Sequence, residues 1–158
     1  MPIKFNMDEV LEMACQIERN GSKFYRDASA IVPADQGAEL LMKLAEQEDV
    51  HLDTFQQMRS ELSAAETETE TYDPYCEAAL YLQAMADSKV FDSKELDGTE
   101  TLDEIFKLAL QAEKDSVAFY VGLKEMVPQE SGKEKMSAVI KEEMSHIRWI
   151  IDEMKGAN

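Results

Sequence analysis

Two glutamate–histidine pairs carry the strongest chemical signal in the sequence. Glu48 and His51 are three residues apart, and Glu143 and His146 repeat that spacing with the only other histidine of the chain. On a helix, residues three apart lie on one face, so each pair presents a carboxylate and an imidazole together. These are donor groups that bind iron, manganese and zinc in proteins. A single pair is weak evidence for a metal site, but two matching copies strengthen it considerably.

The two pairs belong to an internal repeat of 95 residues. The segment ACQIERNGSKFY (14–25) aligns with ALQAEKDSVAFY (109–120), and five of the twelve positions are identical. The same shift places Pro33 on Pro128 and each glutamate–histidine pair on the other. Repetition of this kind indicates two copies of one structural unit.

The helices that must position these residues can be read from the apolar pattern. Hydrophobic side chains at three- and four-residue spacing predict long amphipathic helices over about residues 6–31, 35–63, 101–126 and 131–155. Pro33 and Pro128 fall in the turns, which predicts two helical hairpins, about 6–63 and 101–155.

The connection over residues 64–100 is long for a bundle of this size. It starts with an acidic, threonine-rich linker (63–74), and a short helix is predicted near 75–86. A connection of this length can run along a bundle, as crossover-type four-helix bundles require. We therefore predict an all-α fold: one domain over residues 1–158, built as a four-helix bundle with a long crossover and a short extra helix.

The hairpin geometry adds two more glutamates to the candidate site. Glu18 and Glu48 lie 15 residues before and after Pro33, and the second hairpin repeats this with Glu113. Residues equally far from a turn lie at equal height, here about 22 Å from it at 1.5 Å per residue. Asp49 and Glu142, which adjoin the motif glutamates, point about 100° away around the helix and are not counted as ligands.

All of these residues fall within apolar stripes. Burying an uncompensated carboxylate costs several kcal/mol, and four together would also repel one another. Two divalent cations would balance the four negative charges, and imidazoles would add neutral donors. The predicted ligands of a dinuclear metal site are Glu18, Glu48, His51, Glu113, Glu143 and His146.

Composition excludes several other functions. The chain has 158 residues with 33 acidic and 16 basic side chains, a formal charge of −17, which disfavours nucleic acid and anionic membranes as partners. No apolar run is long enough to cross a membrane. The first residues, MPIKFNMDEV, lack the apolar core of a signal peptide, so we expect a cytoplasmic location. Two cysteines cannot build a four-cysteine metal site.

The combined pattern resembles the ferritin-like superfamily, and specifically the rubrerythrin-type di-iron domain. This resemblance covers almost the whole chain. It implies a ferritin-like bundle whose six ligands hold two iron ions that react with hydrogen peroxide or oxygen. By motif position, Tyr25 and Tyr120 match tyrosines of the family that contact the ligands rather than the metal.

Two departures from the family pattern bear on function. The four cysteines of a rubredoxin module are missing from this sequence, so an external protein is expected to donate electrons. Rubrerythrins carry a further glutamate three residues after the third-helix ligand, where this chain has Ser116. The same ligands would serve a ferroxidase or iron-handling protein. Manganese or zinc could also occupy the site, and with an inert metal the bundle would be structural.

Assembly follows from the long crossover. A homodimer is expected, in which the two chains could exchange helical hairpins. In the exchanged form each site would combine Glu18, Glu48 and His51 of one chain with the second hairpin of the other.

Overall fold

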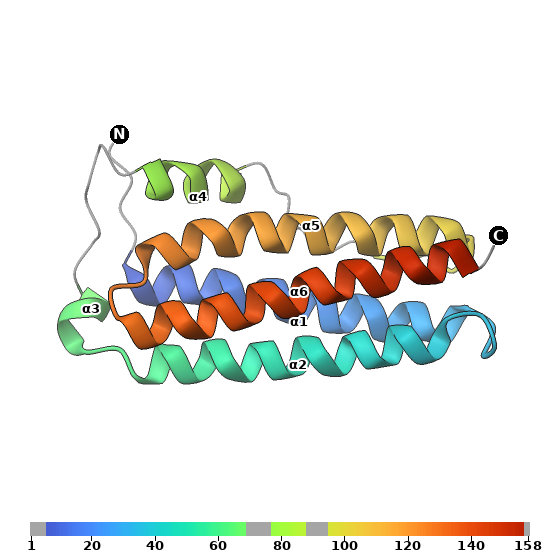
Figure 1. Ribbon diagram of the computed structural model, residues 1–158, viewed down its shortest axis with the longest axis horizontal. Helices are drawn as coiled ribbons and strands as arrows, with labels where there is room; N and C mark the ends of the chain where they lie inside the picture. The colour runs from blue at the N-terminus through green and yellow to red at the C-terminus, as the bar shows by residue number, and fades with distance from the viewer. Residues whose placement is uncertain (1–5, 69–76, 88–94, 157–158) are drawn as a thin grey trace.

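The computed structural model describes residues 6–68, 77–87 and 95–156, which contain helices and no strand. Four long helices form the bundle: α1 (Met7–Ile31), α2 (Ala38–Ser60), α5 (Leu102–Met126) and α6 (Glu130–Gly156) (Figure 1). Two short helices, α3 (Ala64–Glu68) and α4 (Glu77–Asp87), belong to the connection between the hairpins. The predicted all-α bundle with a crossover and a short extra helix is confirmed.

The two hairpins begin in the same way, which shows the repeat at the level of hydrogen bonds. Asn6 caps α1 by accepting from the Glu9 amide at 2.8 Å, while the Glu9 carboxylate accepts from the Asn6 amide at 3.0 Å. Thr101 and Glu104, each 95 residues later, form the same capping box at the start of α5. Both helices are 25 residues long. Because a capping box fixes where a helix starts, equivalent residues of the two copies keep equivalent positions.

The turn between α1 and α2 is longer than predicted. The sequence predicts that α2 starts near residue 35, whereas it starts at Ala38. The Gln36 amide donates to the Pro33 carbonyl at 2.9 Å, and Gly37 has a φ of 90°. A Cβ at position 37 would also lie 2.7 Å from Cζ of Phe106. The turn therefore needs glycine for both its backbone conformation and its contact with α5.

The start of the connection was also predicted incorrectly. Residues 63–74 were expected to be a linker, but α3 forms within them. Ser63 and Glu66 make reciprocal side chain–backbone hydrogen bonds of 3.2 Å and 2.8 Å, and such a capping box favours a helical turn despite the acidic composition. The remainder of this predicted linker, from residue 69, lies outside the described residues.

The short helix predicted near 75–86 is α4, which packs along α5 (Figure 1). Leu82 is fully buried, and the Tyr81 hydroxyl donates to the Ala118 carbonyl at 2.6 Å. Residues 75 and 76 lie outside the described part of the chain. Helix α4 thus attaches to the outside of the second hairpin.

The two hairpins point in opposite directions. The α1–α2 turn lies at one end of the bundle and the α5–α6 turn at the other (Figure 1). Between the hairpins, α1 packs against α5, and α2 packs against α6. This arrangement brings the middle of each long helix to the middle of the bundle.

The apolar core is divided into two parts. One cluster includes Leu11 and Phe119, and the other includes Leu44 and Phe106. Between them lies a layer of buried polar side chains from all four long helices. Buried polar and charged groups need partners that offset the cost of removing them from water, so this layer is the candidate functional site.

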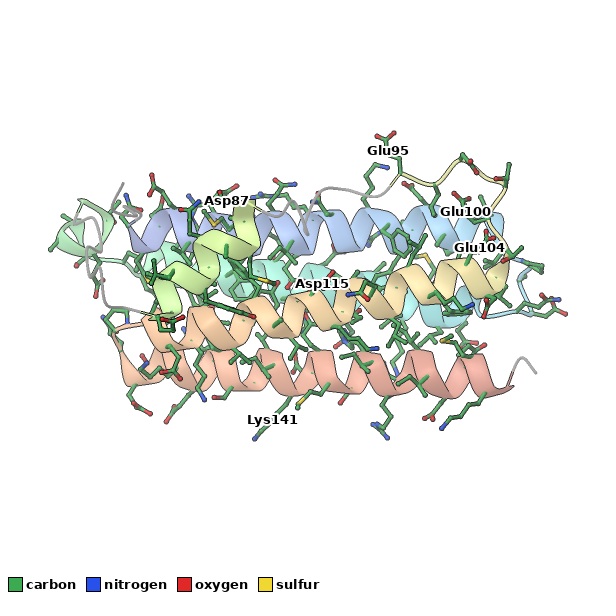
Figure 2. All side chains as sticks on the ribbon, turned by 90° about the horizontal axis from the view of Figure 1, so that it is seen from above. Asp87, Glu95, Glu100, Glu104, Asp115 and Lys141 are labelled. Carbon is green, nitrogen blue, oxygen red and sulfur yellow. The ribbon has the colours of Figure 1, made fainter. Side chains whose placement is uncertain are left out.

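The surface is acidic. Figure 2 shows carboxylates along the face formed by α4, α5 and the chain leading into α5, among them Asp87, Glu95, Glu104 and Asp115. None of the described helices is both long enough and apolar enough to cross a membrane.

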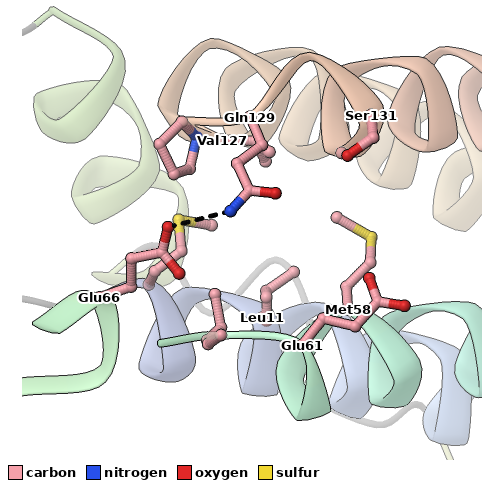
Figure 3. A pocket seen from close by; sticks show the side chains of 11 residues that line it. Leu11, Met58, Glu61, Glu66, Val127, Gln129 and Ser131 are labelled. Carbon is pink, nitrogen blue, oxygen red and sulfur yellow. Dashed lines mark hydrogen bonds between the residues drawn. The ribbon is translucent and has the colours of Figure 1, made fainter. Parts of the chain in front are cut away.

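One pocket opens at the end of the bundle, where the α5–α6 turn faces α3 and the end of α2 (Figure 3). Leu11, Met58 and Val127 line it, and the Gln129 side-chain amide donates to Glu66 at 3.4 Å across it. None of the six predicted ligands lines this pocket.

Candidate metal centre

The six predicted ligands meet in the polar layer at the centre of the bundle. Every one is at least 96 % buried, since Glu48 is the most exposed at 4 %. They come from four helices: Glu18 (α1), Glu48 and His51 (α2), Glu113 (α5), Glu143 and His146 (α6). All six converge within a single chain. Neither a dimer nor an exchange of hairpins is needed to assemble the cluster, and both stay predictions.

The cluster contains two overlapping sets of donor atoms. One set is Glu18, Glu48, His51 and Glu143, and the other is Glu48, Glu113, Glu143 and His146. Within each set the donor atoms lie within 4.8 Å of one another. Glu48 and Glu143 belong to both sets, as carboxylates that bridge two metal ions would.

Both histidines turn the same ring nitrogen toward the carboxylates. Nδ1 of His51 lies 3.3 Å from Oε1 of Glu143 and 3.6 Å from Oε2 of Glu18. Nδ1 of His146 lies 2.9 Å from Oε2 of Glu143 and 3.6 Å from Oε1 of Glu113. The two imidazoles stack with centroids 5.5 Å apart. Nδ1 is therefore the nitrogen available to a metal at either set.

Several buried polar atoms in the cluster have no hydrogen-bond partner. They are Glu18 Oε2, Glu48 Oε1, His51 Nδ1, both carboxylate oxygens of Glu143, and Nδ1 and Nε2 of His146. Buried polar atoms are normally satisfied, so a convergent group of unsatisfied oxygens and nitrogens calls for an explanation. Divalent cations fit this donor set, because carboxylate oxygen and imidazole nitrogen are ligands of iron, manganese and zinc.

Two buried tyrosines fix the outer glutamates. The Tyr25 hydroxyl on α1 donates to Oε1 of Glu113 on α5, and the Tyr120 hydroxyl on α5 donates to Oε1 of Glu18 on α1. Each tyrosine thus contacts a candidate ligand, as the family resemblance implies, and that glutamate belongs to the opposite hairpin. Burial, and secondarily the nearby carboxylate charge, raises the pKa of both phenols well above the ordinary value, so they act as hydrogen-bond donors.

Small residues stand beside the cluster at equivalent positions of the repeat. A Cβ at Gly21 would lie 3.3 Å from Oε2 of Glu48, so any side chain there would crowd that carboxylate. Ser116, 95 residues later, is 8 % exposed, and its hydroxyl donates to the Ala112 carbonyl at 3.0 Å. Serine has no carboxylate, and its hydroxyl is bonded to its own helix, so position 116 adds no donor to either set.

The acidic neighbours of the motif glutamates have separate roles. Asp49 accepts from the Ser22 hydroxyl at 2.7 Å and pairs with Arg26 at 2.6 Å, which ties α2 to α1. Glu142 reaches across from α6 to α2, where its Oε2 lies 2.8 Å from Nε2 of His51.

Sequence reasoning missed the contact of Glu142. Its helical position, about 100° from Glu143, predicts a side chain that points away from the site. Because α2 packs beside α6, that direction leads to the neighbouring helix instead. Neither Asp49 nor Glu142 belongs to the donor sets. The one available signal was that a buried ring nitrogen facing away from the cluster needs an acceptor.

The electrostatics of the protein part of the cluster favour bound protons. Burial and the charge of Glu48 raise the pKa of Glu18 well above its ordinary value, and burial and the charge of Glu143 do the same for Glu113. Burial lowers the pKa of His51, but the Glu143 carboxylate 3.3 Å from Nδ1 outweighs it and raises that pKa to about 9. Burial likewise lowers the pKa of His146, and its carboxylate partners raise it to about 12. Cations that enter must therefore displace protons.

Comparison with known proteins supports the assignment from geometry. A solved structure from Thermotoga maritima, described as a ferritin-like diiron-carboxylate protein, superposes with a TM-score of 0.75 over 100 % of both chains, at 22 % identity. The fold thus places the chain among ferritin-like helical bundles. No curated protein matches the chain.

The sequence model of the rubrerythrin family matches residues 9–153, which includes all six cluster residues. The chain belongs to the rubrerythrin family. This family is the one that the sequence pattern resembles.

Proposed function

We propose that this chain is a di-iron redox protein that reduces hydrogen peroxide or oxygen with electrons from a separate donor protein. The observation that carries the proposal is the pair of four-residue donor sets sharing Glu48 and Glu143. Two adjacent metal positions joined by carboxylates suit a two-electron reaction. Membership of the rubrerythrin family supports iron as the metal.

The protein groups have distinct tasks in this proposal. Two iron ions bound there would supply the two electrons that convert hydrogen peroxide and two protons into two water molecules. His51 and His146 hold Nδ1 toward the metal positions, while Tyr25 and Tyr120 orient the outer glutamates. The apolar clusters above and below the polar layer exclude bulk water from it.

An iron-handling role is the second candidate, and Ser116 favours it. A glutamate at this position would offer an additional ligand on one side of the cluster, which serine does not replace. The same six ligands would then hold iron in both oxidation states. Ferroxidase chemistry requires only that ferrous iron binds and is oxidised, so it does not depend on a change of ligands.

The rate of reoxidation tests the proposal. Protein loaded anaerobically with ferrous iron is mixed in a stopped-flow instrument with hydrogen peroxide or with air-saturated buffer, and the ferric absorbance is followed. We expect peroxide to oxidise the centre faster than oxygen does. A rate with peroxide no higher than that with oxygen would remove the peroxidase assignment in favour of the oxidase or iron-handling role.

Replacing either buried tyrosine is expected to change the reaction without removing the metal. Tyr25→Phe deletes the donor to Glu113 and leaves the ring in place, and groups that orient a ligand typically affect activity by about 10–100-fold. Metal content by elemental analysis should stay at the wild-type value, while the reoxidation rate falls.

Tyr81→Phe provides the matched control for this experiment. It also removes a tyrosine hydroxyl, here one that forms a hydrogen bond between α4 and α5, outside the cluster. If Tyr25→Phe and Tyr81→Phe both reoxidise at the wild-type rate, Tyr25 contributes only to packing.

A further inference from the structure

The two histidines of the cluster differ in what their outward nitrogens contact. Nε2 of His51 lies 2.8 Å from Oε2 of Glu142. Nε2 of His146 is buried and has no hydrogen-bond partner among the described residues. Beside that second ring lies Trp149, with its centroid 5.4 Å from the imidazole centroid. The six donors are arranged almost symmetrically, but the surroundings of the two imidazoles are not.

The internal repeat explains where this difference comes from. The residue 95 positions before Glu142 is Gln47, which precedes Glu48 as Glu142 precedes Glu143. An amide stands where the symmetric partner of the Glu142 carboxylate would be. No hydrogen bond within the described ranges joins Gln47 to His146. The six candidate ligands therefore follow the repeat, whereas Glu142, which contacts His51, has no equivalent carboxylate in the other copy.

A carboxylate behind a ligating imidazole has a defined physical effect. By accepting the Nε2 proton it holds the ring in the tautomer whose Nδ1 lone pair is free, and it makes Nδ1 a stronger donor. It also restrains the ring against rotation. His51 has this support from a different helix, with the Glu142 side chain 51 % exposed and reaching in from the surface. His146 has to adopt its binding orientation without it.

We infer that Glu142 is a positioning residue that makes the two metal positions unequal. The position formed around Glu18 and His51 binds a divalent cation first, and the position around Glu113 and His146 fills second. This inference rests on the proposed metal centre, because it orders the filling of that site. It assigns to Glu142 a role that depends on neither the identity of the metal nor its oxidation state.

Histidine NMR can observe the order of filling directly. The chain has two histidines, so protein labelled with ¹⁵N-histidine gives two imidazole spin systems. Metal-free protein is titrated with zinc, which is diamagnetic and does not change oxidation state. We expect the His51 signals to move to their bound positions during the first equivalent, and those of His146 during the second.

The variant Glu142→Gln supplies the decisive comparison, and Glu134→Gln is its control. Glu134 is an exposed carboxylate on the same helix, so its removal changes the net charge equally without touching the cluster. In Glu142→Gln we expect the preference for His51 to disappear and the first binding step to weaken by about 10–100-fold. Circular dichroism checks that both variants keep their helices.

Three results would overturn the inference: simultaneous loading of both histidines in the wild type, loading of His146 first, or an unchanged order in Glu142→Gln. Failure of the wild type to bind zinc, manganese or iron at all is a different result. It would remove the metal centre itself, and with it the proposed function.

Discussion

Replacing Glu143 by alanine is expected to reduce metal binding from two ions per chain to less than one. Glu143 belongs to both donor sets, and its two oxygens approach Nδ1 of both histidines, at 3.3 Å for His51 and 2.9 Å for His146. Removing it takes a ligand from each position and leaves three carboxylates to neutralise two dications. Both positions should weaken together, in contrast to a change at Glu18 or Glu113.

Elemental analysis and fluorescence measure this loss independently. The single tryptophan, Trp149, lies 5.4 Å from the His146 ring, so binding of ferrous or cobaltous ions should quench its emission. The wild type should show quenching that saturates at two equivalents, and Glu143→Ala should show little.

Glu66→Gln is the matched control for Glu143→Ala. That carboxylate lies on α3 at the end of the bundle, where it contacts Ser63 and Gln129. If Glu143→Ala retains two tightly bound metals, or if Glu66→Gln loses them equally, the assignment of the ligands is wrong.

Removing the metals with a chelator is expected to lower the melting temperature by about 15–30 °C. Each metal, at a free concentration about 1,000 times its Kd, adds about 4 kcal/mol to the free energy of unfolding. The melting temperature of a chain this long changes by about 2–4 °C per kcal/mol. Without metal, protons on Glu18, Glu113 and the two histidines offset the buried carboxylate charge. Calorimetry of zinc-loaded and chelated protein measures the difference.

The difference in melting temperature between zinc-loaded and chelated protein depends on pH, and the pKa values give the direction of this dependence. In the metal-free state the histidine pKa values are raised, to about 9 for His51 and about 12 for His146. Their contribution to stability is complete below the unfolded pKa of about 6.5 and is lost as pH rises through the folded values. The raised pKa values of Glu18 and Glu113 act in the same direction, because the folded state again binds more protons than the unfolded one.

Stability of the chelated protein should therefore fall between pH 6.5 and pH 9. The stability of the zinc-loaded protein should not fall over this range, because the metals replace the same protons and bind more tightly as pH rises. The gap between the two melting temperatures should widen over this range. A gap that stays constant, or narrows, would contradict displacement of protons from the cluster. Lys107→Gln, which removes an exposed ion pair with Asp103, should leave the pH dependence unchanged.

Much of the candidate site could be predicted from the sequence because its determinants are local or repeated. Helical periodicity is a short-range property, so the four long helices follow from the spacing of apolar side chains. The 95-residue repeat and the matched distances from Pro33 and Pro128 place Glu18 with Glu48, and Glu113 with Glu143, before any contact is known. A buried glutamate within an apolar stripe already implies that something must balance its charge.

Helix boundaries were less predictable where a few atoms decide them. The late start of α2 depends on the left-handed conformation of Gly37 and its proximity to Phe106, which is distant in sequence. The turn of helix in α3 depends on one capping box, at Ser63 and Glu66, inside a segment whose composition disfavours helix. In both places a local geometric detail outweighs average propensity.

By itself the sequence determined the residue types of the candidate ligands, their helices and their positions along the bundle, since each follows from periodicity along one hairpin. Only the tertiary structure decided how the hairpins face each other. In this packing α2 lies beside α6, so that the half-exposed Glu142 carboxylate reaches His51, and Nδ1 of each histidine faces the other residues of the cluster. Contacts between helices depend on packing angle and side-chain reach, and neither is written in the spacing of residues along one helix. The repeat predicts two similar halves. The sequence already breaks it at Gln47 and Glu142, and the packing of α6 on α2 turns that break into a difference between the two histidines.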